Sequence, residues 1–488
     1  MDRILAGIET EYGLYVEGRG AEDQIEDAMA LVRSYPGECL ASWDYRYESP
    51  RADLRGFKLD RLEIDPKDAQ FDRGKAHPSD HEVRSDRILP NGARLYNDHG
   101  HPEYATPECW STAELALQDR AGELAVLQSA EAMAAESGRA IRIYKNNTDF
   151  HGASYGTHES YLVPRALGFD ALVQAVLPML VVRQVLCGAG KVGAETGPHC
   201  SYQLSQRADF LVEQVNAETL YRRPIFNTRD EPHARHGEWI RLHVICGDAN
   251  MLSSATARKV GLVKLALSLA TAGEAPVWKL KDPVAAFKSI SRDESYEFRV
   301  ELEGRSWTNA SEILESYFAA SDVVFGPNLL AEGLVRECRQ LLADLRDCPE
   351  RFASSVDWAA KRAMLEAYMA SEGSDWRDPA LRSFDLEYHN ISPDEGLFYA
   401  LPQSKETASQ AELMVRLAEP TETTRALPRS LAVARFKDLL VTACWRSLTF
   451  EIEGKRVEVE LFPDKDYPAH LREVSDVVQF IEMLRGVE

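Results

Sequence analysis

Short apolar runs that end in charged or polar residues recur along the first half of this chain. The clearest are ILAGIETE near the N-terminus, ARLYND, AIRIYKNN and IRLHVICGD. Runs of this length and composition are typical of strands, and long helical patterns at 112–136 and 171–190 lie between them. Functional side chains are commonly presented where strands end and loops begin. The pattern therefore predicts a protein whose chemistry lies at the ends of its strands.

The acidic balance of the chain excludes some classes of function. Its 488 residues include 56 basic and 78 acidic side chains, so the formal net charge is −22. A surface of this sign repels nucleic-acid phosphates and anionic membranes. The apolar stretch at 171–190 is interrupted by Gln174, Pro178 and Arg183, which favours a buried helix over a transmembrane one. We expect a monomer with neither a nucleic-acid nor a membrane partner.

The N-terminus and the cysteines favour a cytoplasmic location. MDRILAGIETEYG contains an acidic residue and only a brief apolar run, unlike a secretory signal peptide. The eight cysteines are scattered and form no CxxC pair. This spacing favours reduced thiols over a disulfide framework or a zinc site.

Two glutamates near the N-terminus form a candidate metal site. Glu9 and Glu11 are two apart on a predicted strand, so their side chains leave the same face. Carboxylates held this close resist joint ionisation unless a cation lies between them, and Mg²⁺ prefers such oxygen ligands. Glu103, His158 and His243 are able to complete the site. The alternative is an exposed edge strand, with each histidine in a structural role.

The stretch RILPNGARLYNDHGHPEYATPEC, residues 87–109, concentrates titratable groups just after a predicted strand. These groups are Asp98, His99, His101, Glu103 and Glu108. Taken alone, the stretch is also consistent with a solvated acidic loop. A catalytic interpretation requires matching groups from distant segments.

Three arginines near predicted strand ends are candidates for binding a polyphosphate. They are Arg207 in LSQRA, Arg229 in NTRDEPH and Arg241 in IRLH. Guanidinium groups bind phosphate well, although surface ion pairing is the better explanation of any one of them alone. GAGKVG at 188–193 has the spacing of a dinucleotide loop, but it follows a helix, and we interpret it as a glycine turn.

The chain divides into two predicted domains. Residues 1–419 form the larger domain, and the segment around 419–429, within EPTETTRALPRS, has the composition of a boundary. Residues 430–488 then alternate like a small α/β unit. Within the large domain, an insertion at about 44–88 is highly charged and poor in large apolar residues over 51–87, so we predict that it is mobile. Its beginning, SWDYRYESPRADLRGF, is aromatic and suggests an anchored end.

Six ordered motifs together resemble one family. They are GIETEYG, NGARLYNDHGHPEYATPE, YKNNTDFHGASYGTHESYL, LSQRA, NTRDEPHA and RLHVICGDANM. This set is similar to the Pup ligase/depupylase family, relatives of glutamine synthetase and other carboxylate–amine ligases. The resemblance implies an α+β fold, in which a curved, mainly antiparallel sheet packs on helices and binds ATP and Mg²⁺.

The same resemblance implies roles for individual residues. It places metal ligands at Glu9, Glu11, Glu103 and His243, with Tyr96 and His158 nearby. It places the essential aspartate of the family on Asp98, five residues before Glu103. This aspartate is a base in the ligases and a nucleophile or water activator in the hydrolases.

The insertion favours the hydrolase branch of the family. SWDYRYESPRADLRGF resembles the start of a loop that depupylases carry and ligases lack. HPEYAT and NNTD are more similar to the ligases. We therefore predict an ATP- and Mg²⁺-dependent depupylase and Pup deamidase that acts on Pup and on pupylated proteins. The alternatives are a Pup–protein ligase, another carboxylate–amine ligase, or a catalytically weak Pup-binding regulator, against which the intact acidic residues argue.

Overall fold

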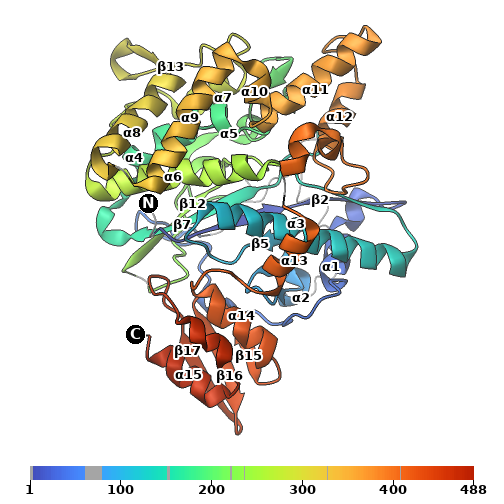
Figure 1. The fold of residues 1–488 in the computed structure, drawn as a ribbon, viewed down its shortest axis with the longest axis vertical. Coiled ribbons are helices and arrows are strands. Elements are labelled where there is room, and N and C mark those ends of the chain that lie inside the picture. The colour runs from blue at the N-terminus through green and yellow to red at the C-terminus, as the bar shows by residue number, and fades with distance from the viewer. Residues whose placement is uncertain are drawn as a thin grey trace.

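A computed structural model describes residues 4–60, 80–150, 154–219, 222–235, 237–326, 328–406 and 408–487. Over this part of the chain, long helices lie on one side of a large sheet, and a smaller C-terminal unit lies at the opposite end of the molecule (Figure 1). Within the described residues, every helix falls short of the length and apolarity that a bilayer crossing requires.

The central sheet is mixed. Its strands are β10 (Glu213–Asn216), β11 (Pro224–Asn227), β12 (Trp239–Val244), β7 (Thr157–Pro164), β1 (Ala6–Glu11), β5 (His101–Ala105), β4 (Arg94–Asp98) and β3 (Arg87–Ile88), in that spatial order. β10 and β11 run parallel, and the other neighbouring pairs are antiparallel. The mainly antiparallel sheet implied by the resemblance thus has one parallel pair at its edge.

Three smaller sheets accompany it in the large domain. They are β2 (Gly13–Val16) with β6 (Ile141–Tyr144), β8 (Lys191–Val192) with β9 (Tyr202–Gln203), and β13 (Arg299–Glu301) with β14 (Trp307–Asn309). β8 lies inside the GAGKVG segment, where Gly190 has a φ of 76°. This left-handed turn agrees with the interpretation of that segment as a glycine turn.

The helices of the large domain lie on more than one side of the sheet, since α1 and α2 are drawn below it in Figure 1. They are α1 (Gln24–Arg33), α2 (Asp80–Arg84), α3 (Thr112–Ser137), α4 (Phe169–Val182), α5 (Gln184–Cys187), α6 (Ser253–Ala272), α7 (Pro283–Ser291), α8 (Ala310–Phe325), α9 (Leu329–Asp347), α10 (Pro349–Ala353), α11 (Asp357–Glu372), α12 (Ala380–Tyr388) and α13 (Gln410–Ala418). The helices predicted at 112–136 and 171–190 correspond to α3 and to α4 with α5. Ser111 caps α3, since its side chain accepts a hydrogen bond from the backbone N–H of Glu114.

The two faces of β1 have different partners. Ala6 and Ile8 belong to the main apolar core, which includes residues of α4 and α6. The hydroxyl of Thr10 donates to Asp119 of α3 over 2.8 Å. Because successive side chains alternate between faces, Glu9 and Glu11 leave the opposite face of the sheet.

The C-terminal residues form an antiparallel unit. It contains α14 (Ala426–Arg435), β15 (Leu440–Ala443), β16 (Ser447–Ile452), β17 (Lys455–Glu460) and α15 (Val477–Arg485). Its strands follow one another as antiparallel neighbours, so the predicted α/β character of residues 430–488 is wrong and the unit is α+β. The reason is local: Glu453 and Gly454 both have positive φ, which closes a tight hairpin.

Both ends of the insertion predicted to be mobile are fixed by contacts. Before residue 61, the backbone N–H of Leu54 donates to the carbonyl of Thr228, which directly follows β11, over 2.7 Å. After residue 79, β3 pairs with β4. Residues 61–79, where the rest of this prediction falls, lie outside the described residues.

Candidate active site

The acidic face of β1 is completed by its two neighbouring strands. Glu11 lies opposite Glu103 of β5, and Glu9 lies opposite His158 of β7. Tyr96 of β4 lies opposite Glu103 on its other side and donates its hydroxyl hydrogen to the Glu103 carboxylate. The antiparallel register therefore assembles side chains from four strands into one row.

Two groups of possible metal ligands occur in this row. In each group, the ligand atoms lie within 4.8 Å of one another. The groups are Glu9 with His158 and His243, and Glu11 with Asp98 and Glu103. The four predicted metal ligands are thus divided between the two groups. His158 joins Glu9 and His243, and Asp98 joins Glu11 and Glu103.

The residues present fit a divalent cation. His243 is 3% exposed, and within the described residues neither of its ring nitrogens has a hydrogen-bond partner. Its Nε2 lies 3.5 Å from Glu9 Oε2, and His158 Nδ1 lies 3.8 Å from the same oxygen. Neutral imidazole and carboxylate groups are common metal ligands.

Burial and mutual repulsion give the carboxyl groups unequal pKa values. Burial and the nearby Asp98 charge raise the pKa of Glu11 to about 7. The pKa of Glu103 is raised well above its ordinary value by burial and by the charges of Asp98 and Glu11. For Glu9, burial acts in the same direction, but His243 and Arg241 outweigh it and lower the pKa. Such a cluster stores repulsion that a bound cation relieves.

Asp98 ends β4, and its two carboxylate oxygens have separate partners. Arg84 Nη1 lies 2.8 Å from Oδ1, and His99 Nδ1 lies 3.0 Å from Oδ2. Burial opposes ionisation, but the charges of His99 and Arg84 outweigh it and hold the pKa of Asp98 well below its ordinary value. The turn to β5 passes through Gly100, whose φ is 93°, and glycine adopts this conformation without steric cost.

The three candidate arginines differ in what they contact. Arg241 Nη1 lies 3.4 Å from Glu9 Oε1, and Arg229 Nη1 lies 3.8 Å from Glu231 Oε2. Both line the cavity over the acidic row, and within the described part of the chain both Nε atoms are buried without a hydrogen-bond partner. These groups are suited to an anion.

Arg207 is committed to the chain itself. Its guanidinium donates twice to the carbonyl of Ile245, once to Ser154 Oγ and once to the carbonyl of Tyr155. Burial lowers its pKa to about 10. These four hydrogen bonds use most of the N–H donors of the guanidinium group. Few donors therefore remain for a phosphate, and the contacts of Arg207 are structural.

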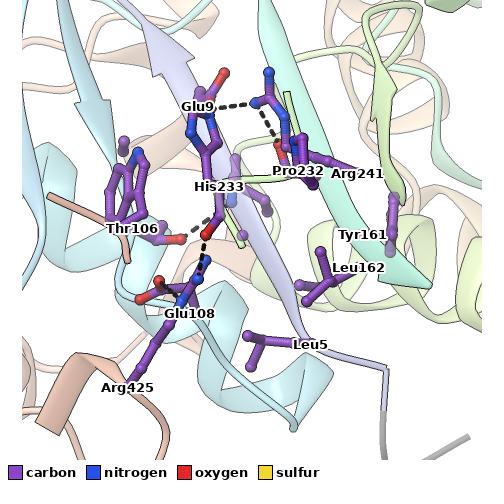
Figure 2. Close-up of a pocket in the computed structure, with 16 residues that line it drawn as sticks. Leu5, Glu9, Thr106, Glu108, Tyr161, Leu162, Pro232, His233, Arg241 and Arg425 are labelled. Atoms are coloured by element: carbon purple, nitrogen blue, oxygen red, sulfur yellow. Dashed lines mark hydrogen bonds and ion pairs between the residues drawn. The ribbon is translucent and has the colours of Figure 1, made fainter. Parts of the chain in front are cut away.

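An apolar pocket adjoins the acidic row along β1 (Figure 2). Glu9 and Arg241 lie at one end of it, and Leu5 and Leu162 lie at the other. Trp445, from the C-terminal unit, forms part of its lining. A mainly apolar lining with a few polar groups is typical of a pocket for a small organic ligand.

The beginning of the insertion crosses the site as a strap, defined here as residues 43–59. At one end, the Trp43 ring meets the ring of Trp445, with centroids 5.0 Å apart. In the middle, the backbone N–H of Ser49 donates to Glu231 over 2.5 Å. At the other end, Asp53 forms a β-bridge with Arg229. The strap thus joins the C-terminal unit to the edge of the cavity.

Two other titratable groups of the 87–109 stretch, Glu108 and His101, belong to neither group of ligand atoms. Glu108 pairs with Arg425 and Arg429, which connect the large domain to α14. His101 stacks on the ring of Tyr155, with centroids 4.6 Å apart. Sequence reasoning also missed Arg84, which lies near the end of the insertion and belongs to no motif that would have identified it.

Comparison with known proteins shows the family of the chain. The model of the Pup-ligase protein family matches residues 3–449. The chain belongs to this family. Among its relatives, a depupylase of Acidothermus cellulolyticus is 37% identical, with 93% of this chain and 92% of the relative covered. A Pup deamidase/depupylase of Mycobacterium tuberculosis is 35% identical, with 99% of both covered.

A ligase of the same family matches less of the chain. Pup–protein ligase 2 of Rhodococcus erythropolis is 39% identical but covers 76% of this chain and 87% of the ligase. Among solved structures, the complex of Pup with its ligase PafA has a TM-score of 0.78 at 27% identity, covering 99% of this chain and 92% of that one. PafA in complex with ADP has a TM-score of 0.73 at 29% identity, covering 88% and 96%.

Proposed function

We propose that this protein is an ATP- and Mg²⁺-dependent hydrolase that removes Pup from lysine side chains and deamidates the C-terminal glutamine of Pup. The observation that carries this assignment is the extent of the match. Depupylases align over 93% and 99% of the chain, whereas the ligase aligns over 76%. The anchored strap supports the same branch, because the insertion that it begins resembles a depupylase loop.

The site offers places for both cofactors. Glu9, His158 and His243 would hold one Mg²⁺, and Glu11 with Glu103 would hold another beside Asp98. Arg229 and Arg241 would bind phosphates, and the apolar pocket beside Glu9 would take the base. When bound, Mg²⁺ and the nucleotide supply fixed positive charge and dipoles that stabilise a developing oxyanion.

Asp98 carries the reaction in this proposal. Hydrolysis breaks the C–N bond of the amide: the carbonyl carbon gains the oxygen of water, and the nitrogen leaves with a proton as ammonia or as a lysine amine. The Asp98 carboxylate either attacks the carbonyl or takes the proton of the attacking water. Both routes require an ionised carboxylate, in agreement with the lowered pKa of Asp98.

The stoichiometry of nucleotide use tests the proposal. The protein is incubated with Pup ending in glutamine or with a Pup-conjugated protein, and ammonia, released target and ADP are measured together. A hydrolase that keeps its nucleotide as a cofactor releases many products for each ADP formed. One ADP per product, or accumulation of conjugate from Pup ending in glutamate, would instead assign the protein to the ligase branch.

A further inference from the structure

Arg84 ends α2, at the point where the described chain returns from the insertion. We propose that Arg84 is a positioning residue for the reaction: its guanidinium fixes the orientation of the Asp98 carboxylate towards the scissile amide. The inference rests on the proposed function, since it assumes that Asp98 performs the chemistry. No motif of the sequence pointed to Arg84, and its contact with Asp98 arises only in the folded chain.

The first support is the geometry of the contact. Arg84 holds Oδ1 of Asp98 at 2.8 Å, and His99 holds Oδ2 at 3.0 Å. Two partners on two oxygens fix both side-chain torsions of an aspartate. A carboxylate can accept about four hydrogen bonds, so lone pairs remain for a substrate or a water molecule. The contact with Arg84 therefore orients the Asp98 carboxylate and leaves lone pairs of its oxygens free to interact with the substrate or water.

The second support is that Arg84 is itself held in place. Nδ2 of Asn97 donates to the carbonyl of Val83 over 2.9 Å, and Arg33 of α1 donates to the carbonyl of Glu82 over 3.0 Å. The guanidinium carbon of Arg84 lies 5.6 Å from the centre of the Tyr96 ring. Because Asn97 precedes Asp98 on β4, the same strand carries the aspartate and anchors the helix that supplies its partner.

The third support is the charge around Asp98. Glu11 and Glu103 belong to the same group of ligand atoms within 4.8 Å, and their repulsion favours any rotamer that moves Asp98 away. Arg84 lies on the cavity wall and supplies the opposing charge. Its side chain is 30% exposed and that of Asp98 is 20% exposed, so water screens the pair less than it screens a fully exposed surface ion pair.

The test separates orientation of Asp98 from docking of α2. In Arg84→Gln, kcat for Pup ending in glutamine should fall roughly 10- to 100-fold, the scale of a misplaced catalytic group. KM and the nucleotide Kd should stay within about threefold of wild type, because the guanidinium acts on Asp98 and not on binding. Arg84→Lys keeps the positive charge but loses the planar guanidinium group. Its kcat should therefore lie between that of the wild-type protein and that of Arg84→Gln.

Arg33→Gln is the matched control, because it removes the exposed tether of α2 but keeps the Asn97–Val83 hydrogen bond and the Arg84–Asp98 contact. It should keep kcat near that of wild type. Three results would overturn the inference: an unchanged or increased kcat in Arg84→Gln, a loss of nucleotide binding as large as the loss of kcat, or an equal loss in Arg33→Gln. Asp98→Asn separates the two proposals. If Asp98→Asn still hydrolyses Pup, the catalytic role of Asp98 is wrong and this inference fails with it, although the proposed function stands. An inactive Asp98→Asn beside a wild-type-like Arg84→Gln removes only the role of Arg84. The proposed function itself fails if the wild-type protein hydrolyses neither Pup ending in glutamine nor a Pup conjugate.

Discussion

Carboxyl groups from β1, β4 and β5 crowd one small space, and Glu11 is the member of this cluster that titrates near neutral pH. Burial and the charge of Asp98 raise its pKa to about 7. Below pH 7, Glu11 therefore carries a proton in the metal-free protein, and a cation has to displace that proton to bind. Metal affinity is expected to depend on pH for this reason.

We predict that Mg²⁺ binds about tenfold more tightly at pH 8 than at pH 6, because a proton competes for Glu11 only at the lower pH. The rise in melting temperature on addition of Mg²⁺ measures this difference at both pH values. In Glu11→Gln, Mg²⁺ binding should weaken and should depend less on pH. Equal stabilisation of the wild-type protein at pH 6 and pH 8 would contradict the assignment of Glu11 as a ligand.

At the scale of elements, the strap depends on one buried carboxylate. Asp53 is 2% exposed and accepts hydrogen bonds from the backbone N–H of Arg55 and from the hydroxyl of Thr228, over 2.8 and 2.6 Å. Its backbone N–H donates to the carbonyl of Phe57, which closes the turn of the strap. The strap end and β11 are therefore joined through a side chain, besides the backbone bond of Leu54.

We predict that Asp53→Ala costs about 1–3 kcal/mol of unfolding free energy, because it leaves the buried Thr228 hydroxyl without its partner. Amide hydrogen exchange over residues 43–59 should accelerate more than exchange in β1. Arg55→Gln is the control: Arg55 pairs with the same carboxylate, but its side chain is 36% exposed, so its loss should be nearly neutral. Unchanged exchange in Asp53→Ala would show that other contacts hold the strap.

At the scale of the whole molecule, a buried ion cluster connects the C-terminal unit to the sheet domain. Arg429 of α14 is fully buried; it pairs with Glu108, donates to the carbonyl of Gly92 and lies 4.7 Å from the Trp445 ring centre. Trp445 lines the pocket proposed for the nucleotide base. The position of the C-terminal unit and the shape of this pocket thus depend on the same contacts.

We predict that Arg429→Met lowers the unfolding free energy by about 3–5 kcal/mol, because it removes one partner of a buried ion pair. Nucleotide affinity should fall with it, since Trp445 loses its support. Denaturant unfolding and titration calorimetry measure the two effects. Arg472→Gln, which breaks a partly exposed pair with Glu419, should change neither. Normal nucleotide binding in Arg429→Met would show that the shape of the pocket does not depend on this ion cluster.

Features that depend on neighbours along the chain could be predicted from the sequence. The alternation of a strand places Glu9 and Glu11 on one face, and the helix predicted at 112–136 corresponds to α3. The titratable stretch after β4 supplies Asp98 and Glu103 to one row because the turn at Gly100 pairs the strands antiparallel. Backbone preferences and side-chain period act over a few residues, so the sequence contains them directly.

Tertiary structure alone decided which distant groups meet. Glu108 belongs to the same titratable stretch as Asp98, yet it pairs with Arg425 and Arg429 and takes no part in the acidic row. Arg207 has the motif of a phosphate ligand, but backbone carbonyls occupy its guanidinium. Arg84 belongs to no recognisable motif, and its position at the end of α2 places its guanidinium beside Asp98. Such pairings follow from the register of strands and the packing of helices far apart in sequence, and no local pattern specifies which partner a charged side chain will reach.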